Sequence, residues 1–391
     1  MAAKKRAKVV RVCFVIEAMT DVRLVEGLAE LGHLTLLARQ IEGQGEISQP
    51  TAVDFEAIRA SLSRIRFSFF VLSHLLRRKS RSDFVLAQGY GLAAAAANVA
   101  GRMTGTPTVM LVCSPTEKYY RCRLATMADG RAFATAPLIA LKLLARFNAL
   151  VGRQYLVLSQ HLSEVVSSHG THRPIIVLPL YGVDTMVFSP AREGKSSIRA
   201  ELHLPTNGFL IFFSSRIAPE KDSDTLLEAV RTLLDEGRDL WLVHCSGGFR
   251  EFQHAASGAG VSHRVIAREA VHPHHELPRY YQASDVCVQS SKEEGLGFSP
   301  LEALACEIPV IAAATGGLIE TILPGKTGWT YPVGDATQLA RCLIAVFENP
   351  AEAKRRAAAG RLLVRERFER TMVFEQLRSL VETSVPRSAA V

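Results

Sequence analysis

The sequence predicts an α/β fold built on open parallel sheets, and three observations support this prediction. Apolar residues make up 48% and charged residues 21% of the chain, as in globular proteins. Short apolar runs alternate with stretches of helical periodicity, which is typical of strand–helix units in a parallel sheet. At 391 residues the chain exceeds one ordinary core. It therefore predicts two domains of roughly 180 to 200 residues each.

The first hundred or so residues contain a predicted N-terminal strand and, further on, a glycine turn after a second strand. Residues 9–16 form a short apolar run with no cleavage site after it, so they predict a strand and no signal peptide. Because no stretch approaches the roughly 20 apolar residues of a spanning helix, we expect a cytoplasmic protein. The strand Phe84 to Ala87 precedes Gly89-Tyr90-Gly91-Leu92-Ala93-Ala94, a G-x-G-x-x-A pattern. The acidic residue that a dinucleotide site needs after the next strand is replaced by Cys113, which argues against a nicotinamide cofactor.

Two predicted helices of the first half combine apolar stripes with basic residues. In the first, which ends at Arg77-Arg78-Lys79, apolar residues recur at spacings of three and four: Ile58, Leu62, Ile65, Phe69, Leu72 and Leu76, widened by Phe67, Phe70, Val71 and Leu75. The second runs from about Pro137 to Leu150, with Leu138, Leu141, Leu144 and Phe147 apolar and with Lys142 and Arg146 paired on another face. Burial against the sheet is the default interpretation, and contact with an anionic membrane interface is the alternative.

The net charge of +8 belongs to the first half. Residues 1–185 contain 23 Lys and Arg against 13 Asp and Glu, a net of +10, and the remainder has 23 against 25, a net of −2. Such a basic surface attracts nucleic acid, anionic lipid or a phosphorylated acceptor. No nucleic-acid-binding motif is present, so we expect no nucleic-acid partner. Seven scattered cysteines indicate a reducing compartment, and no metal is expected; His272-Pro273-His274-His275 is interpreted as a polar loop.

In the second half, two loops follow predicted strands. The strand from Leu210 to Ser215 leads into Arg216-Ile217-Ala218-Pro219-Glu220-Lys221, and a helix follows from Asp222 to Leu233. Arg216, whose guanidinium can donate two parallel hydrogen bonds, and Lys221, whose ammonium is a compact charge, are suited to binding a diphosphate. A solvated surface loop explains the two residues equally well. Thr315-Gly316-Gly317 follows the strand from Pro309 to Ala313, and its amides are candidates for phosphate contacts.

The segment from Glu294 to Glu302 carries most of the functional signal. It lies between the strand from Asp285 to Ser290 and a helix that continues to Cys306. In a parallel sheet this turn lies at the carboxyl ends of the strands, where ligands bind. Glycine amides and a helix N-terminus suit phosphate, and carboxylates suit hydroxyl groups. An alternative for Glu302 alone is a capping box with Ser299, with Pro300 at the first helical position.

With these motifs, the chain resembles family 4 of the retaining, nucleotide-sugar-dependent glycosyltransferases, the group 1 type, which have the GT-B fold of two facing Rossmann-like domains. The resemblance covers nearly the whole chain and rests on Leu31-Gly32-His33, Gly105-Thr106-Pro107, Gly182-Val183-Asp184 with Phe188 and Pro190, Arg216 to Lys221, and the E-x7-E signature Glu294 to Glu302. It implies an acceptor-binding domain over residues 1–185, a nucleotide-sugar domain over 186–366, and over 367–391 a tail whose helix crosses back to the first domain.

The resemblance also implies roles for residues. Glu294 would contact the donor sugar, Arg216 and Lys221 would neutralise the departing diphosphate, and Glu302 would bind the ribose. The amides of Gly295, Leu296, Gly297 and Phe298, together with those of Gly316 and Gly317, would face the sugar and diphosphate. The implied reaction moves a hexose from a UDP or GDP sugar to a hydroxyl of a lipid-linked or envelope glycan acceptor. It retains configuration and needs no metal or other cofactor, and the departing phosphate takes the acceptor's proton.

The first half departs from the family pattern. The loop from Glu17 to Arg23 has no glycine, Cys113 replaces a frequent histidine, and Tyr181 replaces a frequent asparagine. Acceptor-side candidates are Asp21, Arg23, Cys113, Glu117 and Lys118. Two other functions stay open: a donor-binding but inactive relative with a regulatory or scaffolding role, and another enzyme on this fold, such as an epimerase or a phosphorylase. We expect a cytoplasmic protein, with a peripheral position on the cytoplasmic membrane face as the alternative.

Overall fold

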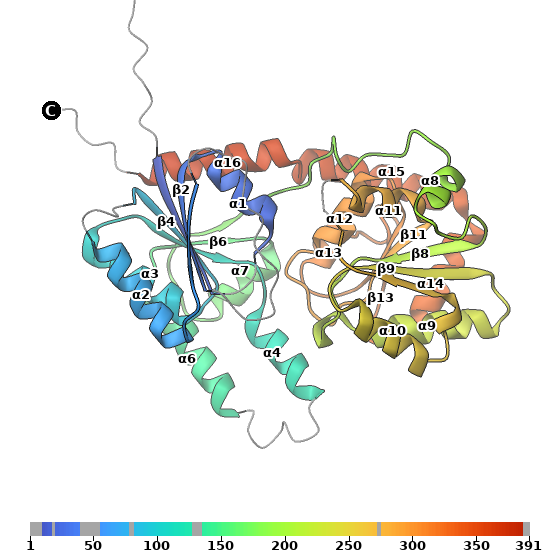
Figure 1. Cartoon of the computed structure of the whole chain (residues 1–391), viewed down its shortest axis with the longest axis horizontal. Coiled ribbons are helices and arrows are strands. Elements are labelled where there is room, and N and C mark those ends of the chain that lie inside the picture. Colours follow the sequence, from blue (N-terminus) through green and yellow to red (C-terminus); the bar gives the residue numbers. More distant parts are fainter. Residues whose placement is uncertain are drawn as a thin grey trace, which may run out of the picture. The chain divides into compact units, whose positions relative to one another are not determined.

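The computed structural model describes residues 10–17, 20–39, 55–77, 82–126, 135–271 and 275–385. The predicted basic N-terminus, part of the loop after the first strand, and three residues of the histidine-rich loop therefore lie outside the described residues. The chain divides into two compact units (Figure 1). Unit 1 comprises Met1–Glu117, Ala132–Tyr181 and Val373–Val391, and unit 2 comprises Lys118–Arg131 and Gly182–Met372.

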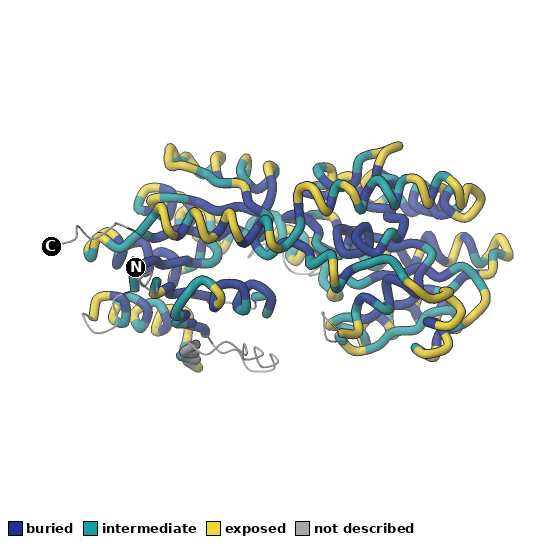
Figure 2. The backbone as a smooth tube through the Cα atoms, turned by 90° about the horizontal axis from the view of Figure 1, so that it is seen from above, coloured by how far each residue is buried: buried dark blue, intermediate teal, exposed yellow. Residues whose placement is uncertain are grey.

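Unit 1 is built on a seven-stranded parallel sheet with the order β3-β2-β1-β4-β5-β6-β7. Its strands are β1 (Val10–Ile16), β2 (Gly32–Arg39), β3 (Phe55–Ala60), β4 (Phe84–Gln88), β5 (Thr108–Val112), β6 (Gln154–Val157) and β7 (Ile175–Val177). The central strands are buried apolar runs because helices cover a parallel sheet on both faces (Figure 2). The order reverses between β1 and β4, as in Rossmann-like sheets.

The helices of unit 1 are α1 (Val22–Ala29), α2 (Arg64–Leu76), α3 (Leu92–Thr104), α6 (Thr135–Val151), α7 (Gln160–Ser167) and most of α16 (Arg370–Ser384). Helix α3 lies between α2 and α6 and contacts both. Helix α16 packs on α1, where the ring of Phe374 occupies the space that a side chain at Gly27 would need. The expectation that the C-terminal helix returns to the first domain is thus confirmed.

Unit 2 is a six-stranded parallel sheet with the order β10-β9-β8-β11-β12-β13. Its strands are β8 (Phe209–Phe213), β9 (Leu240–Cys245), β10 (Val265–Arg268), β11 (Val286–Gln289), β12 (Val310–Ala313) and β13 (Trp329–Tyr331). Its helices are α4 (Thr116–Ala125, from Lys118 onward), α8 (Lys195–Glu201), α9 (Ser223–Asp235), α10 (Phe249–Gly258), α11 (Leu277–Ala283), α12 (Phe298–Ala305), α13 (Leu318–Thr321), α14 (Ala336–Glu348) and α15 (Pro350–Arg367), with 3₁₀ turns η2 (Pro219–Lys221) and η3 (Ser262–Arg264). The α/β class and the parallel sheets are therefore as predicted.

Helix α2 differs from its prediction in extent and orientation. Ile58 lies on strand β3, and the helix begins only at Arg64. Its buried face consists of Phe67, Val71 and Leu75. In the predicted apolar stripe these three residues lay only at the edge. Ile65 and Phe69, central to the predicted stripe, are 61% and 69% exposed. The helix is thus apolar on both faces.

Helix α6 has the same character. Ala145 and Ala149 are buried on one side, whereas the large exposed residues are Ile139, Leu143, Phe147 and Leu150. Among the described residues, no helix is long and apolar enough to cross a membrane.

Candidate functional site

The candidate site lies at the carboxyl ends of β8 and β11. These two strands are neighbours in the sheet, but the chain passes from β8 to β9 on one side and returns through β11 on the other. Crevices at such a reversal of strand order are where open α/β sheets bind ligands. The loop from Ser214 to Asp222 follows β8, and the loop from Ser290 to Gly297 follows β11. The structure therefore brings together Arg216, Lys221 and Glu294.

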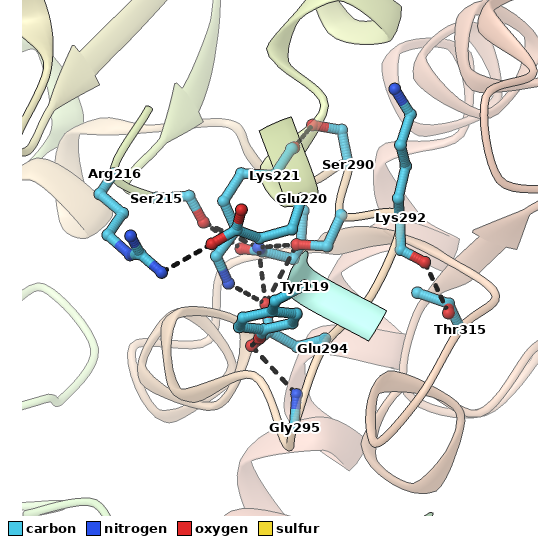
Figure 3. Close-up of polar contacts among 12 residues, drawn as sticks. Tyr119, Ser215, Arg216, Glu220, Lys221, Ser290, Lys292, Glu294, Gly295 and Thr315 are labelled. Carbon is cyan, nitrogen blue, oxygen red and sulfur yellow. Dashed lines mark hydrogen bonds and ion pairs between the residues drawn. The ribbon is translucent and has the colours of Figure 1, made fainter. Parts of the chain in front are cut away.

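Lys221 and Glu294 form a buried ion pair. Lys221 Nζ lies 2.5 Å from Glu294 Oε2, and each side chain is 11% exposed (Figure 3). The same carboxylate oxygen accepts hydrogen bonds from Ser291 Oγ at 3.0 Å and Gln289 Nε2 at 3.2 Å. A carboxylate that accepts from several donors is held in one orientation. Glu294 thus has the fixed position that recognition of a ligand hydroxyl requires.

A second charged cluster centres on Glu220, whose side chain is completely buried. Glu220 Oε1 accepts from Arg216 Nη2 at 2.8 Å and from Arg123 Nη2 at 2.9 Å, and Oε2 accepts from Arg123 Nε at 3.2 Å. Burial alone would raise the pKa of Glu220, but the hydrogen bonds from Arg123 and the charge of Arg216 hold this pKa below its ordinary value.

Glu220 and Arg123 were not predicted as site residues. Glu220 stood inside the predicted diphosphate loop, and its spacing of four from Arg216 was an available signal. Arg123 is 97 residues away along the chain, so no local pattern could reveal the contact.

Helix α4 adds an aromatic residue and a second ion pair to this site. Tyr119 Oη lies 3.5 Å from Glu294 Oε1, and its ring centroid lies 5.9 Å from Lys221 Nζ. Burial and the charge of Glu294 raise the pKa of Tyr119 well above its usual value, so the phenol stays a neutral donor. Lys118, expected on the acceptor side, pairs instead with Glu293 of unit 2, with Nζ and Oε2 3.3 Å apart.

The two glycine turns of unit 2 interlock. A side chain at Gly316 would overlap the carbonyl oxygen of Glu294, and one at Gly317 would overlap that of Gly295. The amide of Gly317 donates to the Glu294 carbonyl oxygen at 3.1 Å. These glycines therefore let one loop seat the backbone of the catalytic candidate Glu294. Their contact with a phosphate stays a prediction.

The start of α12 excludes the capping box. The N-cap residue is Gly297, with φ of 91°, and the helix begins at Phe298 without a side-chain cap, so Ser299 lies inside the helix. Glu302 is 2% exposed, and its Oε2 accepts from Tyr281 Oη at 2.8 Å. The capping-box interpretation of Glu302 is wrong because the helix starts two residues too early for it. Leu296 is buried, and the Gly295 amide lies 3.3 Å from Glu294 Oε1.

Most of the acceptor-side candidates of unit 1 have partners of their own. Asp21 caps α1 and accepts both from the Arg23 amide and from the Arg23 guanidinium, which lies over the ring of Tyr181. Burial, and secondarily the charge of Asp21, raise the pKa of the Cys113 thiol to about 12, so this thiol is protonated. Glu117 Oε1 lies 3.2 Å from His169 Nε2 in unit 1.

In the G-x-G-x-x-A turn of unit 1, a side chain of the same unit contacts the start of helix α3. The carboxylate of Glu17 accepts from the Ala93 amide at the start of α3 and lies against Gly91. A carboxylate there takes the place that a phosphate would need at this helix N-terminus. Among the described residues, no group of three or more His, Cys, Asp or Glu is placed to hold a metal ion.

Solved structures share this fold over nearly the whole chain. Sucrose-phosphate synthase from Thermosynechococcus elongatus aligns with a TM-score of 0.77 and 20% identity, covering 96% of this chain and 98% of that one. Anabaena Alr3699/HepE, solved in complex with UDP-glucose, aligns with a TM-score of 0.76 and 15% identity over 95% and 99%. Fold and site together define a two-domain α/β protein of the GT-B class, with a charged cluster at the switch point of unit 2.

The second unit matches a known family by sequence. Residues 194–362 match the family described as glycosyl transferases group 1. The resemblance inferred from the motifs is thereby confirmed.

Similar curated proteins carry related names. A D-inositol 3-phosphate glycosyltransferase of Streptomyces bingchenggensis (strain BCW-1) is 32% identical over 213 residues, 50% of this chain and 45% of that protein. A GDP-mannose-dependent alpha-(1-6)-phosphatidylinositol monomannoside mannosyltransferase of Mycolicibacterium smegmatis (strain ATCC 700084 / mc(2)155) is 33% identical over 207 residues, 51% and 53%. The matches thus span about half the length of these relatives.

Proposed function

We propose that this protein is a hexosyltransferase, which moves a hexose from a nucleoside-diphosphate sugar to a hydroxyl acceptor with retention of configuration. The observation that carries the proposal is the arrangement of Arg216, Lys221 and Glu294 around one switch point, with two cations and a fixed carboxylate. The family of residues 194–362 and the names of the similar proteins support it.

The chemistry asks mainly for charge stabilisation. Departure of a nucleoside diphosphate leaves an oxocarbenium-like sugar and an anion, and fixed cations stabilise that anion without reorganising. Arg216 and Lys221 supply these charges, and Glu294 orients the sugar through its hydroxyls. The departing phosphate takes the acceptor's proton during attack from the same face, so the proposal needs neither a protein base nor a metal.

The donor in this proposal is a UDP or GDP sugar, and the acceptor is a lipid-linked or envelope glycan. A similar protein is named as GDP-mannose-dependent with a phosphatidylinositol mannoside acceptor, which favours a lipid-linked acceptor here. The exposed apolar residues of α2 and α6, together with the basic Arg64, Arg66, Lys142 and Arg146, favour a peripheral position on the anionic cytoplasmic face of a membrane.

A donor-binding but inactive protein is the second candidate. It is favoured by the first unit, in which Asp21, Arg23 and Glu117 are engaged with other side chains. Turnover separates the two candidates: release of nucleoside diphosphate that depends on an acceptor supports the enzyme, whereas binding without turnover with any acceptor supports the inactive relative.

The donor site is tested by calorimetry with UDP, GDP and ADP on the full chain, repeated with the double variant Arg216→Ala, Lys221→Ala. We expect micromolar binding of one nucleotide and its loss in the double variant. Absence of binding in the wild-type protein would contradict the proposed function.

A further inference from the structure

Two arginines share one buried carboxylate beside the proposed diphosphate site. Arg123 of α4 contacts Glu220 through both Nε and Nη2, whereas Arg216 contacts it through Nη2 alone. The Glu220 side chain is completely buried, and those of Arg123 and Arg216 are 48% and 52% exposed. The forked contact of Arg123 is therefore the more complete of the two.

A buried carboxylate needs a cation, and losing its last partner is costly. Arg216 is the residue that the proposed function assigns to the diphosphate; its guanidinium is half exposed and donates to Glu220 through Nη2. A guanidinium that must hold a buried carboxylate has less freedom to turn toward a diphosphate. If Arg216 were the sole partner of Glu220, turning it toward a nucleotide would leave that carboxylate buried and unpaired.

We propose that Arg123 is a positioning residue of the donor site, which holds Glu220 so that Arg216 is free to engage the diphosphate. This inference rests on the proposed function. It gives α4, a helix encoded in the first half of the chain but grouped with unit 2, a role in donor binding. It also explains why Glu220 has two arginine partners, when one forked contact already engages both of its oxygens.

The competing explanation is a direct contact between Arg123 and the nucleotide. The two explanations differ in what happens when the charge of Glu220 is removed. If Arg123 acts through Glu220, its loss has no consequence in a Glu220→Gln background, because Arg216 is then free in any case. If Arg123 binds phosphate itself, its loss weakens binding in either background.

The test is calorimetric titration of the full chain with UDP, GDP and ADP, using whichever binds. We expect Arg123→Met to bind about tenfold more weakly than wild type, Arg123→Lys to fall between them, and Glu220→Gln to bind at least as tightly as wild type. The double variant Arg123→Met, Glu220→Gln should match Glu220→Gln alone. Arg121→Met, an exposed arginine on the same helix, is the matched control and should leave binding unchanged.

The outcomes separate the inference from the proposed function. Wild-type affinity in Arg123→Met, or a tenfold loss that persists in the double variant, would overturn the positioning role while the donor site stands. No nucleotide binding by the wild type would overturn both. In turnover, the donor KM should rise in Arg123→Met with little change in kcat. Melting curves check folding, and if Arg123→Met does not fold, Arg123→Lys and the double variant carry the same comparison.

Discussion

Glu294 is the residue on which the proposed chemistry depends most. Its Oε2 accepts from a lysine, a serine and a glutamine, and the backbone beside it is seated by a glycine turn. Because this carboxylate is already held in place, it can bind a ligand hydroxyl without first rearranging.

Replacing Glu294 by Gln should lower turnover by about 10² to 10³-fold while the chain stays folded, because the amide still accepts from Ser291 but no longer carries the charge. Release of nucleoside diphosphate from the donor measures this, and circular dichroism reports the fold. Glu293→Gln, which removes only the partner of Lys118, is the control. Full activity in Glu294→Gln would remove Glu294 from the catalytic assignment.

His244 makes the stability of unit 2 sensitive to acid. It is completely buried, its Nδ1 lies 2.9 Å from the Phe213 carbonyl oxygen, and burial lowers its pKa from 6.5 to about 4. In the unfolded chain His244 is protonated below about pH 6.5, whereas in the folded chain it is protonated only below about pH 4. Stability from this group is present above pH 6.5 and is lost as the pH falls toward 4.

Between pH 7 and pH 5 this histidine should cost the fold about 2 kcal/mol of unfolding free energy. Urea unfolding at the two pH values measures the loss. His244→Asn, which keeps a donor for the Phe213 carbonyl oxygen but does not titrate, should show a pH dependence smaller by about this amount. An identical pH dependence in the two proteins would show that His244 does not titrate in this window.

At the scale of elements, the site depends on two loops that fit together only through glycine. Gly316 has a φ of 51° and lies against the Glu294 carbonyl oxygen, so its backbone conformation and its surroundings both exclude a side chain. The sequence identified this turn by its spacing after a strand, but it assigned the turn to phosphate. The contact with the Glu294 backbone links loops 22 residues apart and has no local signature.

Gly316→Ala should destabilise the protein by about 3 kcal/mol and weaken nucleotide binding, because the loop that carries Glu294 must shift. Melting temperature and calorimetry measure the two effects. Gly258→Ala in α10, where a Cβ meets nothing within 4 Å, should be neutral or slightly stabilising. Equal behaviour of the two variants would show that the turn tolerates displacement.

At the scale of the whole chain, the strand–helix alternation was enough to predict two parallel sheets, because buried strands and amphipathic helices differ in period. Strand β11 and the turn at Glu294 illustrate this success. Periodicity could not decide how α2 is oriented, since Phe67 and Phe69 are equally apolar and only packing on the sheet chooses between them. Nor could it predict the contact of Arg123 with Glu220, which depends on how distant segments meet.

The exposed apolar residues of unit 1 lead to a prediction about location. Helices α2, α3 and α6 lie side by side, and Phe69 on α2 and Leu143 on α6 are 69% and 60% exposed. Apolar side chains on neighbouring helices, with arginine and lysine among them, match an anionic membrane interface.

The full chain should therefore sediment with vesicles containing phosphatidylglycerol and not with vesicles of phosphatidylcholine alone, and added salt should weaken the binding. The double variant Phe69→Ser, Leu143→Ser should bind at least about tenfold more weakly, since each side chain loses apolar area buried in the interface. Leu362→Ser on α15 of unit 2, where the leucine is 58% exposed, is the matched control and should bind like wild type. Equal sedimentation of the double variant and wild type would mean that α2 and α6 do not form the membrane-binding face, and that their exposed side chains serve another partner.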